Sequence, residues 1–363
     1  MSLRTLTFEF DQQSFLRDVW QQQPMLIKNA LPDWRSPLTP EELAGLSLEE
    51  TADSRLVSLS DDVWQLREGP FEPRHFDRSD AWTLLVNGVD QWVPAVAQLK
   101  QCLRFLPGWR FDDIMVSYAV AGGGVGPHFD RYDVFLLQGT GSRLWRLGDW
   151  CDENTPRIDH DDLNLLESFD TSEEYLLEPG DVLYVPPGLA HWGIAETDCL
   201  TYSLGFRAPR ITDLMARWVD SALERIDPDL LLEDGSSVRS PPRPGEITLA
   251  HHENARQAVI NALTALDDGA WLGQLVTESG DHSEPMRPSP KRVQLYPGAR
   301  LAWDDVDNGC RVFANGELYI SCGAVQPFIE QLCGQSSIDY AALKACDAEL
   351  CAFLVENGVL QQA

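Results

Sequence analysis

Residues 124–148 read GVGPHFDRYDVFLLQGTGSRLWRLG and contain a His-x-Asp motif, His128-Phe129-Asp130. A third candidate ligand, His191, follows 63 residues after His128 in EPGDVLYVPPGLAHWG, residues 178–193. Side chains at positions i and i+2 of an extended strand share a face, so His128 and Asp130 converge while Phe129 points away. Two histidines and one carboxylate leave open positions on a metal, as non-haem Fe(II) oxygenases require for a co-substrate and O2. The motif therefore predicts a metal site made of His128, Asp130 and His191.

The chain contains a second copy of the motif, His75-Phe76-Asp77. With 7 histidines and 57 acidic residues among 363, about one such match is expected by chance. His75 lies in a polar stretch that includes Pro73 and shows no alternating pattern. His128 lies between two runs typical of strands, residues 114–120 and 134–137. We therefore expect only the His128 copy to bind a metal.

Short alternating strands separated by Gly and Pro follow one another from about residue 110 to residue 207, which is typical of an antiparallel β-sandwich or barrel. One of them is Val182–Val185, with turn residues on both sides. The first 90 residues combine a helix at 13–21 with a strand at 24–28. The loop at 149–173 is long and strongly acidic, which indicates a lid or a partner-binding element.

The periodicity becomes helical after residue 207. Residues 211–226 predict an amphipathic helix with Thr212 as its N-cap, and residues 255–266 lie in a second helix. The pair His251-His252 is expected to be solvated at the start of that helix. Pro-rich stretches at 236–245 and 285–290 predict a connector and a linker. A strand, a hairpin turning at Asn315-Gly316 and three helical segments then suggest a winged-helix module.

Composition limits the partners and the compartment. The net charge of −29 and a pI near 4.4 disfavour nucleic acid, which is bound through Lys and Arg, and favour a basic protein partner. Solubility or adaptation to salt would explain the same charge. Residues 280–363 hold eleven acidic residues against six Lys and Arg, so the winged-helix module is expected to contact protein rather than DNA. Neither a secretory signal nor an apolar run of 18 residues is visible, which predicts a cytoplasmic protein without a membrane span. The eight cysteines show no zinc or disulfide spacing.

These motifs resemble those of the JmjC-type 2-oxoglutarate-dependent oxygenases, and among them the bacterial ribosomal oxygenases. The resemblance rests on residues 122–148, on residues 178–193, on TYSLGFRAP at 201–209 and on QQPMLIKNALPDW at 22–34, and it extends over the whole order of parts. It implies a mixed β and α fold: a double-stranded β-helix (cupin or jelly-roll) core at 1–209, a helical dimerisation segment at 210–279 and a winged-helix-like domain at 280–363. It also implies a homodimer that hydroxylates the β-carbon of an arginine in large-subunit ribosomal protein L sixteen.

The resemblance assigns roles to individual residues. His128, Asp130 and His191 match the Fe(II) ligands, Arg143 matches the arginine that pairs with the distal carboxylate of 2-oxoglutarate, and Ser117 matches a serine at the same co-substrate. Thr201 stands at a further co-substrate position, where related sequences carry Asn, and Trp192 is a second departure, next to the pocket.

Strand parity supports the assignment of Arg143 independently. If residues 143–147 form a strand, Arg143 shares a face with Trp145 and Leu147, whereas Arg146 shares the other face with Leu144. An inward guanidinium beside an aromatic ring needs a buried anion. The alternative is that both arginines lie at the surface. By the same parity Tyr132 is a candidate to grip the substrate, and Asp133 faces away unless a bulge intervenes.

Two other functions remain open at this stage. The chain could hydroxylate a histidine or a lysine of another basic protein, because pockets around the same iron site vary. It could also be a non-catalytic cupin-type module that binds a basic partner, although a complete set of ligands argues against a decayed site.

Overall fold

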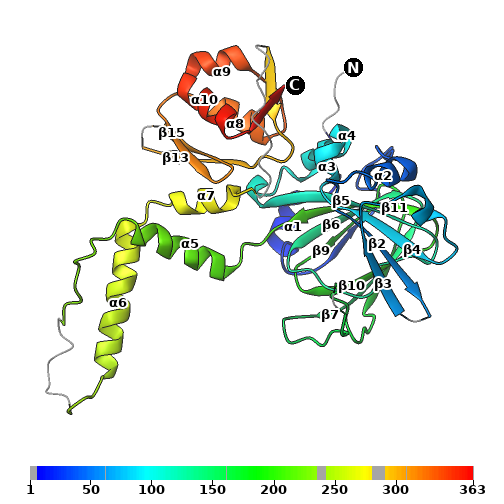
Figure 1. Cartoon of the computed structure of the whole chain (residues 1–363), viewed down its shortest axis with the longest axis horizontal. Coiled ribbons are helices and arrows are strands. Elements are labelled where there is room, and N and C mark those ends of the chain that lie inside the picture. The colour runs from blue at the N-terminus through cyan, green and yellow to red at the C-terminus, as the bar shows by residue number, and fades with distance from the viewer. Residues whose placement is uncertain are drawn as a thin grey trace. The chain divides into compact units, whose positions relative to one another are not determined.

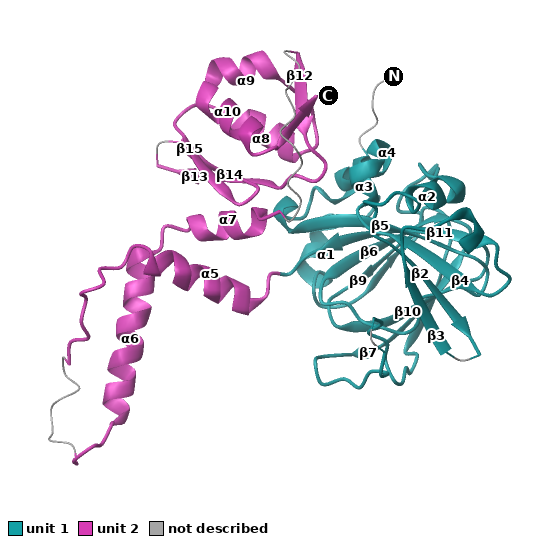
Figure 2. Cartoon of the chain, in the orientation of Figure 1, with its two compact units in different colours: residues 1–208 teal, residues 209–363 magenta. Residues whose placement is uncertain are grey.

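The computed structural model describes residues 6–61, 63–160, 162–234, 243–279, 291–307 and 309–362. The chain divides into two units, residues 1–208 and 209–363 (Figure 2). The three-domain division stays a prediction, because its second boundary falls at residues 280–290, outside the described residues. The linker at 285–290 and most of the connector, residues 236–242, lie outside them too.

Unit 1 is built on two antiparallel sheets, which together form the expected double-stranded β-helix (Figure 1). The larger sheet has the strand order β1-β9-β6-β11-β5-β4-β2-β3, and the smaller sheet has the order β10-β7-β8. The strands of the larger sheet are β1 (Met25–Ile27), β2 (Ser54–Ser60), β3 (Val63–Glu68), β4 (Trp82–Val86), β5 (Phe111–Ala119), β6 (Asp133–Thr140), β9 (Val182–Val185) and β11 (Cys199–Phe206). Those of the smaller sheet are β7 (Arg143–Trp150), β8 (Glu173–Leu177) and β10 (Leu189–Ala195).

Strand β6 is buried on both of its faces, which explains its continuous apolar sequence. Val134 and Leu136 pack between the two sheets. Their partners there come from both sheets: Trp145, Leu147, Leu177, Leu183, Val185 and Leu189. Phe135 and Leu137 face the other way, into the larger core beneath the N-terminal helices. Burial on both faces fixes the register of this strand over residues 134–137.

Short helices cover the outer face of the larger sheet. They are α1 (Gln12–Asp18), α2 (Pro40–Leu46), α3 (Val89–Trp92), α4 (Pro94–Ala97) and the 3-10 turns η1 (Pro73–Phe76), η2 (Gln98–Leu103) and η3 (Gly108–Arg110). Helix α2 begins with a capping box between Thr39 and Glu42.

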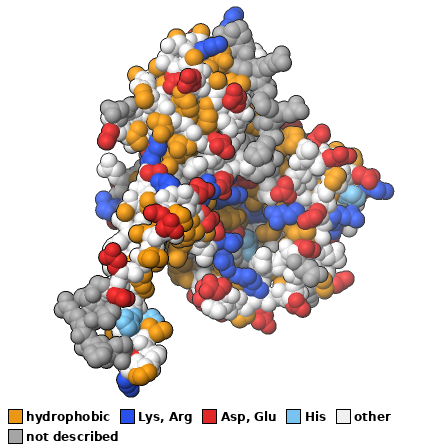
Figure 3. Space-filling view, turned by 60° about the vertical axis from the view of Figure 1, so that its left-hand side comes forward, with side chains coloured by type: hydrophobic (Ala, Val, Ile, Leu, Met, Phe, Trp, Pro, Cys, Tyr) orange, Lys and Arg blue, Asp and Glu red, His pale blue; other side chains and the backbone are white. Residues whose placement is uncertain are grey.

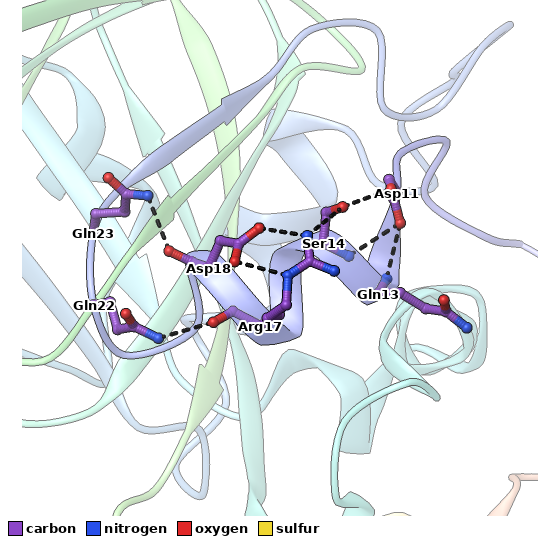
Figure 4. Close-up of polar contacts among 7 residues, drawn as sticks. All are labelled: Asp11, Gln13, Ser14, Arg17, Asp18, Gln22 and Gln23. Carbon is purple, nitrogen blue, oxygen red and sulfur yellow. Dashed lines mark hydrogen bonds and ion pairs between the residues drawn. The ribbon is translucent and has the colours of Figure 1, made fainter.

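Helix α1 is shorter than the predicted 13–21 (Figure 4). It begins after Asp11, whose carboxylate accepts hydrogen bonds from the backbone N–H groups of Gln13 and Ser14, both at 3.1 Å. It ends early because the chain turns at Gln21, where φ is +59°. The side-chain amides of Gln22 and Gln23 donate back to the carbonyl oxygens of Arg17 and Asp18, at 3.2 and 3.0 Å.

Unit 2 starts with three helices, α5 (Ile211–Leu223), α6 (Leu249–Leu266) and α7 (Ala270–Thr277). The predicted N-cap of α5 is wrong: Arg210 holds that position, and Thr212 lies inside the helix. Helix α6 is capped by Thr248, and His251 completes this cap by accepting the Thr248 backbone N–H at 3.1 Å. None of the described helices is long and apolar enough to cross a membrane.

The rest of unit 2 contains the expected hairpin and three helical segments. Its strands and helices are β12 (Arg292–Leu295), β13 (Leu301–Val306), β14 (Gly309–Ala314), β15 (Glu317–Ser321), α8 (Gln326–Cys333), β16 (Ile338–Asp339), α9 (Tyr340–Cys346), α10 (Ala348–Glu356) and β17 (Leu360–Gln362). The sequence did not predict two short strands, β16 and β17, which pair with β12. Strands β14 and β15 form the hairpin that turns at Asn315 and Gly316. A separate apolar core holds this part together.

Candidate active site

The structure brings the three predicted metal ligands together. One ligand atom from each of His128, Asp130 and His191 lies within 4.8 Å of the other two. Two main-chain hydrogen bonds join the segments, from the N–H of His128 to the carbonyl of His191 (3.1 Å) and from the N–H of His191 to the carbonyl of His128 (2.8 Å). A third runs from the N–H of Gly188 to the carbonyl of Asp130 (2.7 Å). These bonds fix the backbone positions from which the three side chains extend.

The motif does not lie in a regular strand, contrary to the parity argument. Strand β6 begins only at Asp133, and His128 makes a single β-bridge to His191. Pro127 has no N–H to extend the ladder, and Gly126 has a φ of +84°. The convergence of His128 and Asp130 is thus set by pairing with β10 rather than by strand alternation.

Both histidines present the correct nitrogen for a metal. Nδ1 of His128 lies 2.9 Å from the carbonyl oxygen of Gly126, and Nδ1 of His191 lies 3.0 Å from that of Leu189. A carbonyl only accepts, so each Nδ1 carries the proton and each Nε2 keeps a free lone pair. Burial, assisted by the neighbouring His128, lowers the pKa of His191 to about 4. His191 is therefore neutral at pH 7, as a metal ligand must be.

A buried guanidinium lies next to this cluster. Arg143 is 4% exposed, and its Nη1 donates to the hydroxyl oxygens of Ser117 (3.1 Å) and Thr201 (3.2 Å). Among the described residues no carboxylate contributes to the electrostatics of Arg143, and its Nε has no hydrogen-bond partner. Burial lowers its pKa. A buried positive charge without a counter-ion is costly, so this site is built to receive an anion.

Arg143 reaches this position from the smaller sheet, while Ser117 and Thr201 are paired neighbours on β5 and β11 of the larger one. Residues 143, 145 and 147 of β7 are buried, as the predicted parity requires. Trp145 lies between the anion site and the metal site, with its ring 5.4 Å from the guanidinium carbon and 5.8 Å from the His191 ring. The tight turn before β7 needs Gly141, since its φ is +60° and a Cβ there would lie 2.1 Å from the Asp198 carbonyl oxygen.

Comparisons with known proteins agree with this geometry. The JmjC domain family matches residues 98–214, and the AraC-like ligand binding domain family matches residues 169–279. The ribosomal protein uL16 3-hydroxylase of Escherichia coli K12 is 37% identical over 286 residues, which cover 76% of this chain and 74% of that protein. A probable ribosomal oxygenase of Haemophilus influenzae is 33% identical over 353 residues, 91% of this chain and 87% of that one. This chain belongs to the JmjC-type ribosomal oxygenases.

Solved structures of E. coli ribosomal oxygenases are similar to this chain over nearly its whole length. The crystal structure of E. coli YcfD has 32% sequence identity and a TM-score of 0.82, and the match covers 98% of this chain and 99% of that one. YcfD has also been solved in complex with cobalt and 2-oxoglutarate, with a TM-score of 0.80 to this chain over the same shares. The oxygenase fold expected from the sequence is thus confirmed.

Sequence reasoning missed one carboxylate of this unit, that of Asp113. Asp113 lies on β5 four residues before Ser117, beside a register shift between β5 and β11, and its carboxylate accepts the Gly88 backbone N–H at 2.8 Å. Burial is the main cause that raises its pKa to about 6, and the charges of Asp112 and Asp90 add to it. The phenol of Tyr132 lies close enough to Asp130 and Asp113 for their charges to raise its pKa further, beyond the effect of partial burial. Strand alternation alone could not have identified Asp113, because the register shifts beside it.

The acidic loop packs against the segment that carries the metal ligands. The N–H of Leu166 donates to the carbonyl of Pro127 at 2.9 Å, and the guanidinium carbon of Arg157 lies 5.1 Å from the Phe129 ring. Whether the loop contacts a partner stays a prediction.

The second His-x-Asp copy lies apart from the site. His75 is in η1, where its Nδ1 accepts the Glu72 backbone N–H at 3.0 Å. Within the described part of the chain, the three residues at 128, 130 and 191 form the one group with metal-ligand geometry. His75 therefore acts as a local cap.

Three further expectations concern residues around the motif. Arg146 points away from Arg143, with its Nε 2.8 Å from Glu174, and its guanidinium lies over the Trp192 ring. Trp192 is paired with Arg146 on the outer face, so it does not reshape the pocket. Asp133 also faces away, fully buried, 3.0 Å from the Arg110 guanidinium.

Proposed function

We propose that this chain is an Fe(II)- and 2-oxoglutarate-dependent oxygenase that hydroxylates the β-carbon of an arginine side chain in a large-subunit ribosomal protein. The observation that carries the proposal is the unpaired, buried guanidinium of Arg143 beside a group of two histidines and one aspartate. The relatives add the substrate class and the co-substrate, because one E. coli relative is a uL16 3-hydroxylase and the E. coli ribosomal oxygenase YcfD has been solved with cobalt and 2-oxoglutarate.

The residues present fit both groups. The Nε2 atoms of His128 and His191 and the carboxylate of Asp130 would hold the metal, a neutral-imidazole and carboxylate set suited to Fe(II). Arg143 would pair with the distal carboxylate of the co-substrate, held by Ser117 and Thr201. When bound, Fe(II) and 2-oxoglutarate supply the activated oxygen for C–H hydroxylation.

The other residues of the site hold the ligand side chains in place and keep water out. The two main-chain bonds between His128 and His191 keep the ligands at fixed places before the substrate arrives. The Trp145 ring fills the space between the sheets next to His191 and excludes water from it.

Asp113 and Tyr132 are the residues we assign to the substrate side chain. An arginine needs a carboxylate acceptor for its guanidinium, and Asp113 offers one on β5, close enough to Tyr132 for its charge to raise the pKa of that phenol. A protonated Asp113 would donate rather than accept, so a cation at this position also keeps the carboxylate ionised near neutral pH. The net charge of −29 steers a basic ribosomal protein toward the enzyme and repels nucleic acid.

We also propose that the enzyme is a homodimer joined through α5 and α6, and that it acts in the cytoplasm without binding a membrane. Both helices expose apolar side chains, among them Leu223 (63% exposed) and Val259 (59% exposed). A cavity of about 360 Å³ between them is lined by apolar side chains of α5, α6 and residues 230–232. Apolar side chains are visible at the surface of this helical part (Figure 3). Burial against a second copy would remove this surface from water.

Mass spectrometry tests the function. Incubation of the enzyme with Fe(II), 2-oxoglutarate and its own organism's ribosomal protein uL16 should add the mass of one oxygen atom to one arginine, and His128→Ala should abolish the addition. The same gain on a histidine or lysine of another ribosomal protein would favour the alternative hydroxylase. A second comparison uses ribosomes from parent cells and from cells that lack the gene. If their proteins show no such mass difference, the non-catalytic binding module is the hypothesis that remains.

A further inference from the structure

Gln138 is a buried amide next to the anion site that the reaction itself does not use. It lies on β6 with no exposed surface. The pairing of β6 with β11 shifts here, because Leu200 pairs with Thr140 whereas Thr201 pairs with Gln138. Gly139 is therefore the extra residue of a β-bulge, a device that redirects side chains next to active sites.

The bulge determines which way the amide points. The side-chain nitrogen of Gln138 donates to the carbonyl oxygens of Thr140 (2.9 Å) and Leu200 (3.3 Å). Both partners can only accept, so the nitrogen must face them. The amide oxygen consequently faces the hydroxyl of Thr201, which donates to it at 3.2 Å.

The Thr201 hydroxyl is thereby left with one role toward Arg143. A hydroxyl has one proton, and here the Gln138 oxygen takes it. Thr201 therefore presents lone pairs to Nη1 of Arg143, 3.2 Å away. Without Gln138 the hydroxyl could rotate and turn its proton toward the guanidinium, which has donors only.

We propose that Gln138 is a positioning residue for the co-substrate: it fixes the Thr201 hydroxyl as an acceptor and so holds the Arg143 guanidinium in the orientation that receives a dicarboxylate. The inference rests on the proposed co-substrate site and extends it by one residue. The competing explanation is that Gln138 only satisfies the carbonyl groups of the bulge.

A double-mutant cycle separates the two explanations. Binding of 2-oxoglutarate is measured by calorimetry on full-length enzyme loaded with Mn(II) without oxygen, alongside thermal unfolding. Gln138→Met and Thr201→Val should each weaken binding by about three- to tenfold, as the loss of one hydrogen bond predicts. The double variant should bind 2-oxoglutarate no more weakly than the single variant with the lower affinity. Both substitutions act through the same hydrogen bonds, which run from Gln138 through Thr201 to Arg143.

Thr140→Val is the matched control. It removes a hydroxyl that accepts the Leu200 backbone N–H at the same bulge, at 3.2 Å, without contacting Arg143. It should lower the unfolding temperature and leave the affinity for 2-oxoglutarate within about twofold.

Three results would overturn the inference. The first is a Gln138→Met enzyme that unfolds earlier but binds 2-oxoglutarate like the parent. The second is full additivity in the double variant. If Gln138→Met does not fold, Gln138→Asn keeps an amide for the carbonyl groups but is too short for Thr201, and parent-like binding by it is the third. A parent enzyme that fails to bind 2-oxoglutarate contradicts the proposed function itself, and this inference with it.

Discussion

His128 and His191 are 63 residues apart in the chain, yet their backbones are hydrogen-bonded to each other in both directions. Side chains can therefore be removed from the metal site without removing the pairing that builds it. Because the backbone pairing does not depend on the side chains, single substitutions at the site can test function without unfolding the protein. Three such substitutions are considered first.

Asp130→Ala should abolish metal-dependent turnover and leave the unfolding temperature close to that of the parent. The variant loses the one charged ligand but keeps the 2.7 Å bond between its carbonyl and the Gly188 N–H. Metal content after reconstitution and thermal unfolding measure the two effects. His75→Ala, at the second copy of the motif, is the control and should retain both metal and activity. An active Asp130→Ala enzyme is incompatible with the assigned ligands.

Arg143→Ala should raise the 2-oxoglutarate concentration needed for turnover sharply, because truncating one partner of a buried charged pair costs about 2–5 kcal/mol. Arg143→Lys should recover only part of the loss, since a point charge cannot form two parallel hydrogen bonds. Saturating iron keeps a metal defect from being mistaken for a co-substrate defect. Arg146→Ala, on the opposite face of β7, should behave like the parent, and a larger effect there would mean that the inward face was assigned wrongly.

Asp113→Asn should stabilise the free enzyme at neutral pH while it impairs hydroxylation of an arginine substrate. Burial, assisted by the charges of Asp112 and Asp90, raises the Asp113 pKa from 3.8 to about 6, although the Gly88 N–H and the Arg207 charge oppose the shift. The folded state thus binds more protons than the unfolded state, so this group lowers stability as pH rises through that window. Asp113→Asn should therefore raise the free energy of unfolding by about 1–3 kcal/mol above pH ~6 and leave it unchanged below pH ~4.

Chemical denaturation at several pH values measures this effect. Asp112→Asn is the control, since Asp112 pairs with Arg207 at 2.6 Å and gains nothing from neutralisation. A stability difference that does not change with pH would show that the Asp113 carboxylate is not the titrating group.

At the scale of elements, the turn between β6 and β7 places Arg143 at the first residue of its strand. Gly141→Ala should therefore affect both folding and co-substrate binding. A Cβ at φ +60° is strained by about 1 kcal/mol, and the contact with the Asp198 carbonyl oxygen adds to it. Reduced unfolding free energy together with weaker 2-oxoglutarate binding is the expected result. Gly108→Ala, where a Cβ meets nothing within 4 Å, should change neither.

At the scale of the whole molecule, the exposed apolar faces of α5 and α6 predict self-association. Leu223→Glu should convert a dimer into a monomer, because a buried unpaired carboxylate is strongly unfavourable at an apolar interface. Analytical ultracentrifugation over a range of concentrations measures the change. Gln257→Glu, at an exposed polar position of α6, should remain dimeric. A parent that sediments as a monomer at every concentration would refute the proposed interface.

Local patterns were sufficient to predict several parts of this enzyme. The strand Val182–Val185 and the inward face shared by Arg143 and Trp145 agree with expectation. His128, Asp130 and His191 also converge as expected, although pairing with β10 rather than strand alternation brings them together. Alternation and turn residues depend on neighbours in the chain, which a sequence displays directly. The same local reasoning misplaced the end of α1 and the N-cap of α5, because long-range packing and turn geometry override weak local preferences.

Pairing between distant strands determined the remainder. The β-bridge that replaces a strand at His128, the bulge that turns Gln138 toward Thr201, and the burial that raises the pKa of Asp113 all arise from residues far apart in the chain. Registers and bulges are set by which strands become neighbours, and the free energy of a charge is set by what surrounds it. Neither quantity is encoded within a window of adjacent residues. For that reason the sequence could predict which side chains cluster at the candidate site but not the contacts that support them.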